Sequence, residues 1–203
     1  MALPVANKPF YTYDEYLALD EADKEVRYEY HHGEVFAMSG TTKVHNRIVR
    51  NLANLLDDHF LPRGYEVWQE QIKVEAKAKE RYYYPDLVVS RSKRDQENTI
   101  MVQDPVLIGE VLSDGKCNIE LKLASYASIP TLKAFLMVSL HEYLMHLYER
   151  RAGKWWYQAV FGKEQPLHLD CFNLSLPVAA VYKNFRLSTR TGQGNEVTEG
   201  FAR

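Results

Sequence analysis

Two acidic residues stand beside or inside short apolar runs that predict buried strands. Asp86 comes directly before residues 87–89, and Glu110 lies within residues 106–111. Both runs are aliphatic or β-branched and are bounded by proline and polar residues, as is typical of core strands. A carboxylate in such a setting is costly unless a cation or hydrogen-bond donors compensate its charge. A divalent cation between the two acids would compensate both, so the pair predicts a metal site.

A lysine is predicted to complete this site. Lys122 shares a helical stripe with Ile119 and Tyr126, which places its amine on the inward face of a helix. Two carboxylates, with the backbone carbonyl of Val111, can hold Mg²⁺ or Mn²⁺, which prefer oxygen ligands and keep bound water. Such a metal lowers the pKa of its water and offsets charge on a leaving oxygen, while Lys122 would orient that water or neutralise the phosphate. The constellation predicts Mg²⁺-dependent phosphodiester hydrolysis; the alternative is that the acids only form ion pairs with Arg or Lys.

The composition is that of an ordinary globular protein. The chain has 203 residues, of which 46% are hydrophobic and 26% are charged, enough for one filled core. We expect a single domain over residues 1–187 and a flexible tail over residues 188–203, where polar residues and glycine dominate. No apolar run approaches the roughly 20 residues of a membrane span and no signal-peptide pattern is present, so the sequence predicts a cytoplasmic protein. In that reducing compartment Cys117 and Cys171 are predicted to be free thiols.

The net charge of −2 provides no global attraction for a polyanion. A DNA-binding protein of this composition needs a local basic face. The candidate cations form three groups: Lys43, Arg47 and Arg50 on one predicted helix; Lys73, Lys77, Lys79 and Arg81; and Arg91, Lys93 and Arg94. The alternative for each is a solvated surface charge, which is the usual position of Lys and Arg.

The order of predicted elements indicates an α/β (α+β) fold. A helix begins after a capping box at Thr12, a hairpin turns at His32-Gly33, and an amphipathic helix covers residues 42–60. Residues 91–104 show no periodicity and are predicted to form a mobile polar loop. Further strands are predicted at residues 65–76, 132–138, 143–148, 154–161 and 167–176, and a short helix after Pro177. These elements predict a central mixed sheet flanked by helices, and the aromatic-rich late strands favour a homodimer through sheet edges.

Several short blocks together resemble a known family. They are residues 28–35, His45-Asn46-Arg47, residues 82–86, residues 105–113, and Lys122 with Tyr126 followed by residues 129–132. In order and spacing, over residues 11–150, they resemble the large bacterial "putative restriction endonuclease" family, whose fold is similar to that of PD-(D/E)XK nucleases. The resemblance implies a DNA substrate, with Asp86 and Glu110 as metal ligands and Lys122 as the catalytic lysine. It also implies His45, Glu29 and Glu34 as supporting residues of the site.

Two alternatives stand beside this resemblance. From the residues alone, Glu29 and Glu34 would be exposed hairpin acids and His45 a hydrogen-bonded bystander. The family also places an aspartate one helical turn before the lysine, where this chain has Asn118, in a loop over residues 113–118 that is shorter than usual. An asparagine keeps hydrogen bonding but loses the charge, although Glu120 could compensate. The alternative to an active endonuclease is therefore a catalytically degenerate protein that keeps the nuclease fold as a binding or assembly module.

Overall fold

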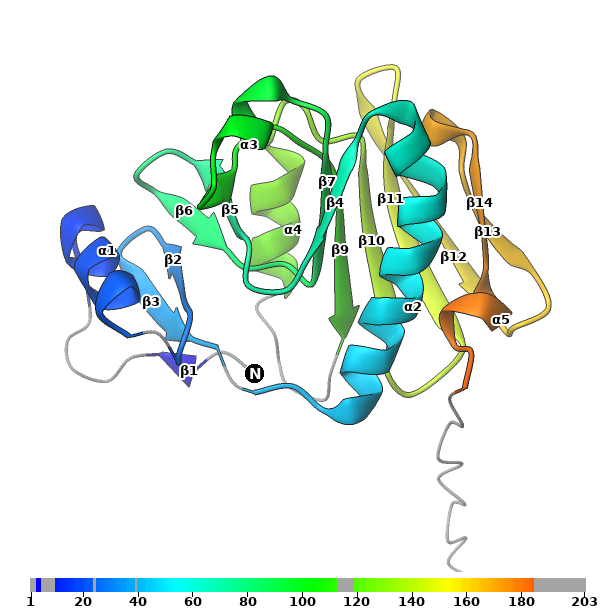
Figure 1. Cartoon of the computed structure of the whole chain (residues 1–203), viewed down its shortest axis with the longest axis horizontal. Helices are drawn as coiled ribbons and strands as arrows, with labels where there is room; N and C mark the ends of the chain where they lie inside the picture. The colour runs from blue at the N-terminus through cyan, green and yellow to red at the C-terminus, as the bar shows by residue number, and fades with distance from the viewer. Residues whose placement is uncertain (1–2, 5–9, 24, 39, 113–118, 185–203) are drawn as a thin grey trace, which may run out of the picture.

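A six-stranded mixed sheet forms the centre of the protein (Figure 1). The computed structural model describes residues 3–4, 10–23, 25–38, 40–112 and 119–184; the predicted tail, Cys117 and the loop that contains Asn118 lie outside these residues. From edge to edge the strands are β12 (Lys154–Phe161), β11 (Leu144–Arg151), β10 (Ala134–Ser139), β9 (Pro105–Leu112), β7 (Leu87–Ser90) and β4 (Glu66–Gln69). Strands β9 and β10 run parallel and the other neighbours run antiparallel.

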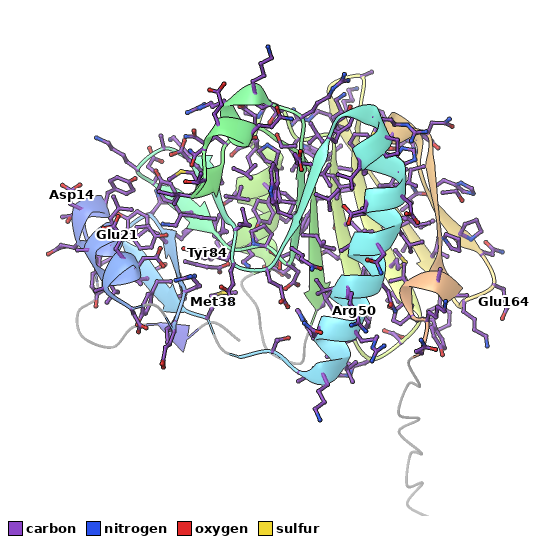
Figure 2. All side chains as sticks on the ribbon, in the orientation of Figure 1. Asp14, Glu21, Met38, Arg50, Tyr84 and Glu164 are labelled. Carbon is purple, nitrogen blue, oxygen red and sulfur yellow. The ribbon has the colours of Figure 1, made fainter. Side chains whose placement is uncertain are left out.

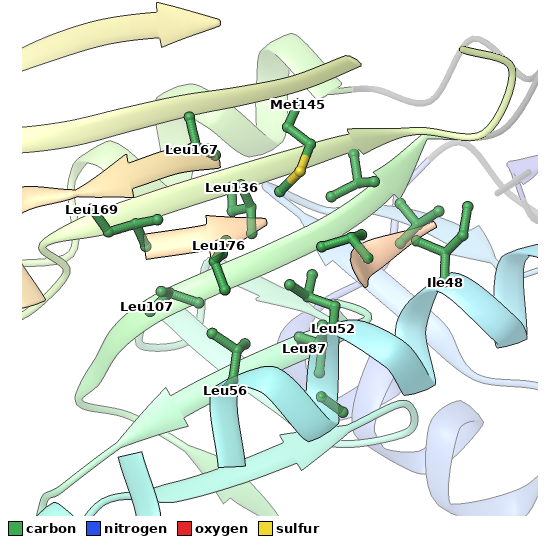
Figure 3. Close-up of a cluster of buried hydrophobic side chains, with 14 of the residues drawn as sticks. Ile48, Leu52, Leu56, Leu87, Leu107, Leu136, Met145, Leu167, Leu169 and Leu176 are labelled. Atoms are coloured by element: carbon green, nitrogen blue, oxygen red, sulfur yellow. The ribbon is translucent and has the colours of Figure 1, made fainter. Parts of the chain in front are cut away.

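Helix α2 (Lys43–Phe60) covers one face of this sheet (Figure 1). Its N-terminus is capped by Thr42, whose hydroxyl accepts a hydrogen bond from the backbone N–H of His45 at 3.2 Å. The buried stripe of the helix, which includes Ile48 and Leu52, packs on leucines of the sheet (Figure 3). Each such buried aliphatic side chain contributes about 1.5–3 kcal/mol, so the core fixes where α2, and with it His45, stands. The same face is covered by β13 (Pro166–Leu169), β14 (Leu174–Pro177) and α5 (Val178–Val181).

The opposite face of the central sheet packs on α4 (Ile119–Ala127), mainly through Tyr126 against Ile108 and Phe135. A second sheet lies beside it, in the order β1 (Leu3–Pro4), β3 (Glu34–Ala37), β2 (Tyr28–His31), β6 (Arg81–Tyr83), β5 (Lys73–Lys77) and β8 (Met101–Val102). Helix α1 (Tyr13–Ala22) has the predicted capping box at Thr12 and packs on this sheet through a cluster of tyrosines. Helix α4 therefore lies where residues of both sheets can reach it.

Three predicted elements are wrong in their bounds. Residues 65–76 are not one strand, because Glu70 and Gln71 adopt positive φ angles of 47° and 59° and the chain passes from β4 in one sheet to β5 in the other. Residues 91–104 are not a featureless loop but contain α3 (Lys93–Glu97) and β8. Residues 167–176 form two paired strands, β13 and β14, joined by a 3₁₀ turn over Asp170–Phe172. In the first and third cases a local turn divides a run whose composition suits one strand, and in the second the pairing of β8 with β5 orders part of a polar segment.

The predicted fold class is confirmed: the chain is a mixed α/β protein with a central mixed sheet flanked by helices. Cys171 is a free thiol, as predicted. Across the described residues, none of the helices combines the length and the hydropathy needed to cross a bilayer.

Candidate active site

The pairing of β7 with β9 brings Asp86 and Glu110 together. Leu87 lies opposite Gly109 in this antiparallel pair, so Asp86, one residue before Leu87, and Glu110, one residue after Gly109, come next to one another. Directly opposite residues of an antiparallel pair project from the same face. The two acids predicted from the sequence thus stand side by side at one end of the sheet.

Glu110 is buried and held by two donors from α4. Its Oε1 atom accepts hydrogen bonds from Lys122 Nζ at 3.1 Å and from the Tyr126 hydroxyl at 3.0 Å. Burial raises the pKa of Glu110 to about 7; the charge of Lys122 opposes this shift, while Asp86 and Glu29 add to it. The site therefore holds more negative charge than its one lysine compensates.

Lys122 bridges Glu110 to a third acid. Lys122 Nζ lies 2.7 Å from Glu29 Oε1, and the same oxygen accepts a hydrogen bond from the backbone N–H of Tyr84 at 3.1 Å. Glu29 is only 3% exposed, so it is not an exposed hairpin acid. Glu34 is exposed at the start of β3, and within the described residues it forms no hydrogen bond or ion pair with the other acids or with Lys122. The structure brings Glu29 to the cluster and leaves Glu34 outside it.

His45 holds Asp86 from the side of α2. Asp86 Oδ2 lies 3.1 Å from His45 Nε2 and accepts a hydrogen bond from the backbone N–H of Val111 at 2.7 Å. Burial lowers the pKa of His45, but the hydrogen bond and charge of Asp86, with Glu70 and Glu110, outweigh it, so the pKa is raised. A protonated His45 would fix Asp86 through a charge-assisted hydrogen bond.

The carboxylates fit a hard divalent cation. The hydrogen bonds above engage Asp86 Oδ2 and Glu110 Oε1, and the second oxygen of each carboxylate takes no part in them. The described residues contain no group of three or more His, Cys, Asp or Glu side chains placed to hold an ion. Mg²⁺ is commonly held by one or two carboxylates and several waters, so Asp86 and Glu110 are the residues that could hold it.

Residues 13–179 match the family described as "Putative restriction endonuclease", named Uma2. The chain belongs to this family. Two similar proteins come from Synechocystis sp.: the uncharacterized protein slr1290 is 29% identical over 182 residues, which are 89% of this chain and 95% of that protein. The uncharacterized protein sll1609 is 30% identical over 156 residues, 75% of this chain and 88% of that protein. A crystal structure of a "putative nuclease belonging to DUF820" from Anabaena variabilis shares the fold, with a TM-score of 0.70 and 15% identity over 84% of this chain and 97% of that one.

In addition to the positions of Asp86 and Glu110, the structure of this Uma2 protein shows two contacts that were not predicted from its sequence. The first is the hydrogen bond from Tyr126 to Glu110, which the spacing could have indicated, because Tyr126 lies one helical turn after Lys122 on the same face. The second is a buried ion pair between Lys73 and Asp20 at 2.8 Å, in which Tyr84 also donates to Asp20 at 2.7 Å. No local pattern could reveal a pair separated so widely along the chain. It also shows that Lys73, a candidate for a basic face, is buried.

Proposed function

We propose that this protein is a metal-dependent endonuclease that hydrolyses phosphodiester bonds of DNA. The observation that carries the proposal is the arrangement of Asp86, Glu110 and Lys122, which come from two adjacent strands and one helix to the same end of the sheet. Membership of a family described as restriction endonucleases, and the fold shared with a protein described as a nuclease, support the same reaction. The cytoplasmic location and the homodimer expected from the sequence stay predictions.

Asp86 and Glu110, with the carbonyl of Val111, would hold Mg²⁺ or Mn²⁺. Such an ion, when bound, supplies a water of lowered pKa and offsets charge on the leaving oxygen. Lys122 would donate a hydrogen bond to the attacking water or to a phosphate oxygen, and its ion pairs with Glu29 and Glu110 hold the amine in place. Hydrolysis would join a water oxygen to phosphorus as the bond from phosphorus to the leaving oxygen breaks, and the water would lose a proton to solvent while the leaving oxygen takes one up.

The neighbouring side chains restrict the motion of these groups. His45 fixes Asp86 through Oδ2, and Tyr126 fixes Glu110 through Oε1. Glu29 and Glu110 both hold Lys122 through ion pairs. Because these side chains are already held in position, they need to reorganise less when the substrate reacts.

Cleavage of supercoiled plasmid DNA by the purified protein tests the proposal. With Mg²⁺ or Mn²⁺ we expect nicked and linear products, and we expect the Asp86→Asn variant to lose at least about 100-fold in rate because it loses a metal ligand charge. Glu97→Gln, an exposed acid of α3 far from Asp86, is the matched control and should cleave as the native protein does. Isothermal titration should show binding of Mn²⁺ to the native protein that Asp86→Asn abolishes. Equal cleavage by native protein and Asp86→Asn would contradict the proposal.

A second candidate function is a binding or assembly module on the same fold. It is favoured by Asn118 in place of the family's aspartate, a residue outside the described part of the chain. Binding of duplex DNA without cleavage and without any heat of Mn²⁺ binding would favour this function.

A further inference from the structure

Helix α2 carries its charges in the order opposite to the one that its dipole favours. Its first turn has no acid, its N-terminal half carries Lys43, Arg47 and Arg50, and its last turn carries Asp57 and Asp58. Peptide dipoles make cations unfavourable near the start of a helix and acids unfavourable near its end. The stability of the helix therefore does not explain this order of charges.

The three cations form one row on the solvent face of α2. Their spacing of four and three residues places them on one side of the helix, over a rise of about 10 Å. That side is opposite the stripe of Ile48 and Leu52, which packs on the sheet. Figure 2 shows Arg50 on the half of α2 where the helix begins. We call Lys43, Arg47 and Arg50 the α2 basic row.

In the described part of the chain, the α2 basic row is a group of candidate cations without local partners, a property that the exposed Lys79, Lys93 and Arg94 share. Within the described residues none of its three side chains forms an ion pair or hydrogen bond. By contrast, Lys73 is paired with Asp20, Lys77 is paired with Glu80 at 2.7 Å, and Arg91 stacks over Tyr65 at 5.3 Å. Lys93 and Arg94 are exposed, but they lie on α3, after the end of β7 that is farthest from Asp86.

The α2 basic row also lies at the end of the helix that bears the candidate site. His45, which contacts Asp86 at 3.1 Å, belongs to the same first turns of α2 as Lys43 and Arg47. Along α2 the cations therefore lie at the end that bears the site, on the face opposite His45, whereas Asp57 and Asp58 lie at the far end, followed by Arg63. A polyanion would be attracted more strongly to the site end.

We infer that the α2 basic row contacts phosphates of the DNA backbone and seats the duplex with its scissile bond at Asp86 and Glu110. This inference rests on the proposed function, because it assigns the substrate contact of the same site. Phosphate contacts position a protein on DNA without reading sequence. A chain of net charge −2 needs such a local surface, because phosphate neutralisation supplies most of the affinity.

Salt-dependent binding to a labelled duplex, measured by fluorescence anisotropy in EDTA so that no cleavage occurs, tests the inference. The variant Lys43→Gln/Arg47→Gln/Arg50→Gln is compared with the control Lys93→Gln/Arg94→Gln/Lys154→Gln, which loses the same charge at the opposite end of the sheet. We expect the slope of log K against log salt to become shallower by about 2 to 3 in the α2 variant, and affinity at low salt to fall more than about 10-fold. The control should keep the native slope. The α2 variant should melt at the native temperature or above, because it removes charges that oppose the dipole.

An unchanged slope in the α2 variant, or an equal loss in the control, overturns the inference. Plasmid cleavage by the native protein separates its failure from that of the proposed function. If the native protein cleaves plasmid DNA but the α2 variant keeps the native slope of log K against log salt, only the α2 contact is overturned. Binding that depends on the α2 basic row without any cleavage upholds the contact and contradicts the endonuclease. Absence of DNA binding by the native protein overturns both.

Discussion

Lys122 Nζ lies 2.7 Å from Glu29 Oε1, so one amine of α4 joins the second sheet to the central one. Glu29 belongs to β2, and the other acid bonded to Lys122, Glu110, belongs to β9. All three side chains are less than a tenth exposed. The contact therefore has a structural role as well as the catalytic one that we propose, and the two roles can be measured separately.

Lys122→Met should destabilise the fold strongly. The substitution leaves two buried acids without their cation, and breaking a buried pair in this way costs about 3–5 kcal/mol. Urea unfolding at pH 7 measures this loss. Lys77→Met is the matched control, because Lys77 is exposed and its pair with Glu80 lies at the surface, where ion pairs contribute about 0–1 kcal/mol. Similar unfolding free energies for the two variants would show that Lys122 does not hold the sheets together.

Tyr126→Phe should separate positioning of Glu110 from binding of DNA. The variant removes only the hydroxyl that donates to Glu110, and a hydrogen bond to a charged group contributes about 1.5–3 kcal/mol. We expect a lower kcat with an unchanged duplex affinity, measured by single-turnover cleavage and anisotropy. Tyr148→Phe is the control, since Tyr148 packs at the margin of the same core and forms no hydrogen bond through its hydroxyl in the described structure. An unchanged kcat in Tyr126→Phe would contradict the role of the Tyr126 hydroxyl in positioning Glu110.

Glu149 should make stability depend on pH. Burial works against its charge, but the backbone N–H of Cys171 and the guanidinium of Arg151 outweigh it and hold the pKa of Glu149 below its ordinary value. A lowered pKa in the folded state adds stability above the ordinary glutamate pKa of about 4.3, and this stability is lost as pH falls through the folded-state value. Glu149→Gln should therefore lower the unfolding free energy by about 1–3 kcal/mol at pH 7.

The difference between native protein and Glu149→Gln should shrink as pH falls from 5 to 3, because both then carry a neutral side chain. Chemical unfolding at several pH values measures it. Glu97→Gln, at an exposed position, should show no such convergence. A difference that stays constant over this range would mean that packing, and not the charge, makes Glu149 important.

The sequence predicted the elements whose burial pattern is periodic. The stripe of α2 is one case, and the strands predicted at residues 143–148 and 154–161, which pair as β11 and β12, are another. It could not predict where single residues with positive φ divide a run, as Glu70 and Gln71 do between β4 and β5. Such conformations depend on which sheet each half joins, which is a tertiary property.

The candidate site shows the same division. The chemistry of an acid in a core strand was enough to identify Asp86 and Glu110 as partners, and the helical period was enough to turn Lys122 inward. The hairpin acids were different, since Glu29 and Glu34 flank the same turn with similar local sequence. Glu29 is buried because β2 pairs with β6, whereas Glu34 begins β3 at an exposed position. The difference in burial between Glu29 and Glu34 arises from the order of strands in the sheet, which a local sequence pattern does not predict.

Strand β12 should form a homodimer contact. Within the described residues it pairs only with β11, in an unbroken register from Leu144 opposite Phe161 to Arg151 opposite Lys154. Its exposed aromatic residues include Tyr157, at 54%, and Phe161, at 74%. Edge strands that remain free are commonly protected by charges, proline or bulges. Strand β12 has one charged residue, Lys154, at its first position, and its Gln158 side chain donates a hydrogen bond to the backbone carbonyl of His168 in β13. An edge of this kind favours pairing with a second copy.

Tyr157→Lys/Phe161→Lys should shift the protein from dimer to monomer, because antiparallel pairing of two β12 edges would bring four added cations together without partners. Size-exclusion chromatography with light scattering measures the mass. Ile100→Lys, an apolar residue 66% exposed beside β8, controls for the general effect of placing lysine on an apolar surface and should keep the native mass. A monomeric native protein at tens of micromolar, or equal masses for all three proteins, would contradict the β12 interface. Because Glu110 on β9 and Asp86 beside β7 stand three and four strands away from β12 in the sheet order, a monomeric variant that still binds duplex DNA would show that each site works without its partner.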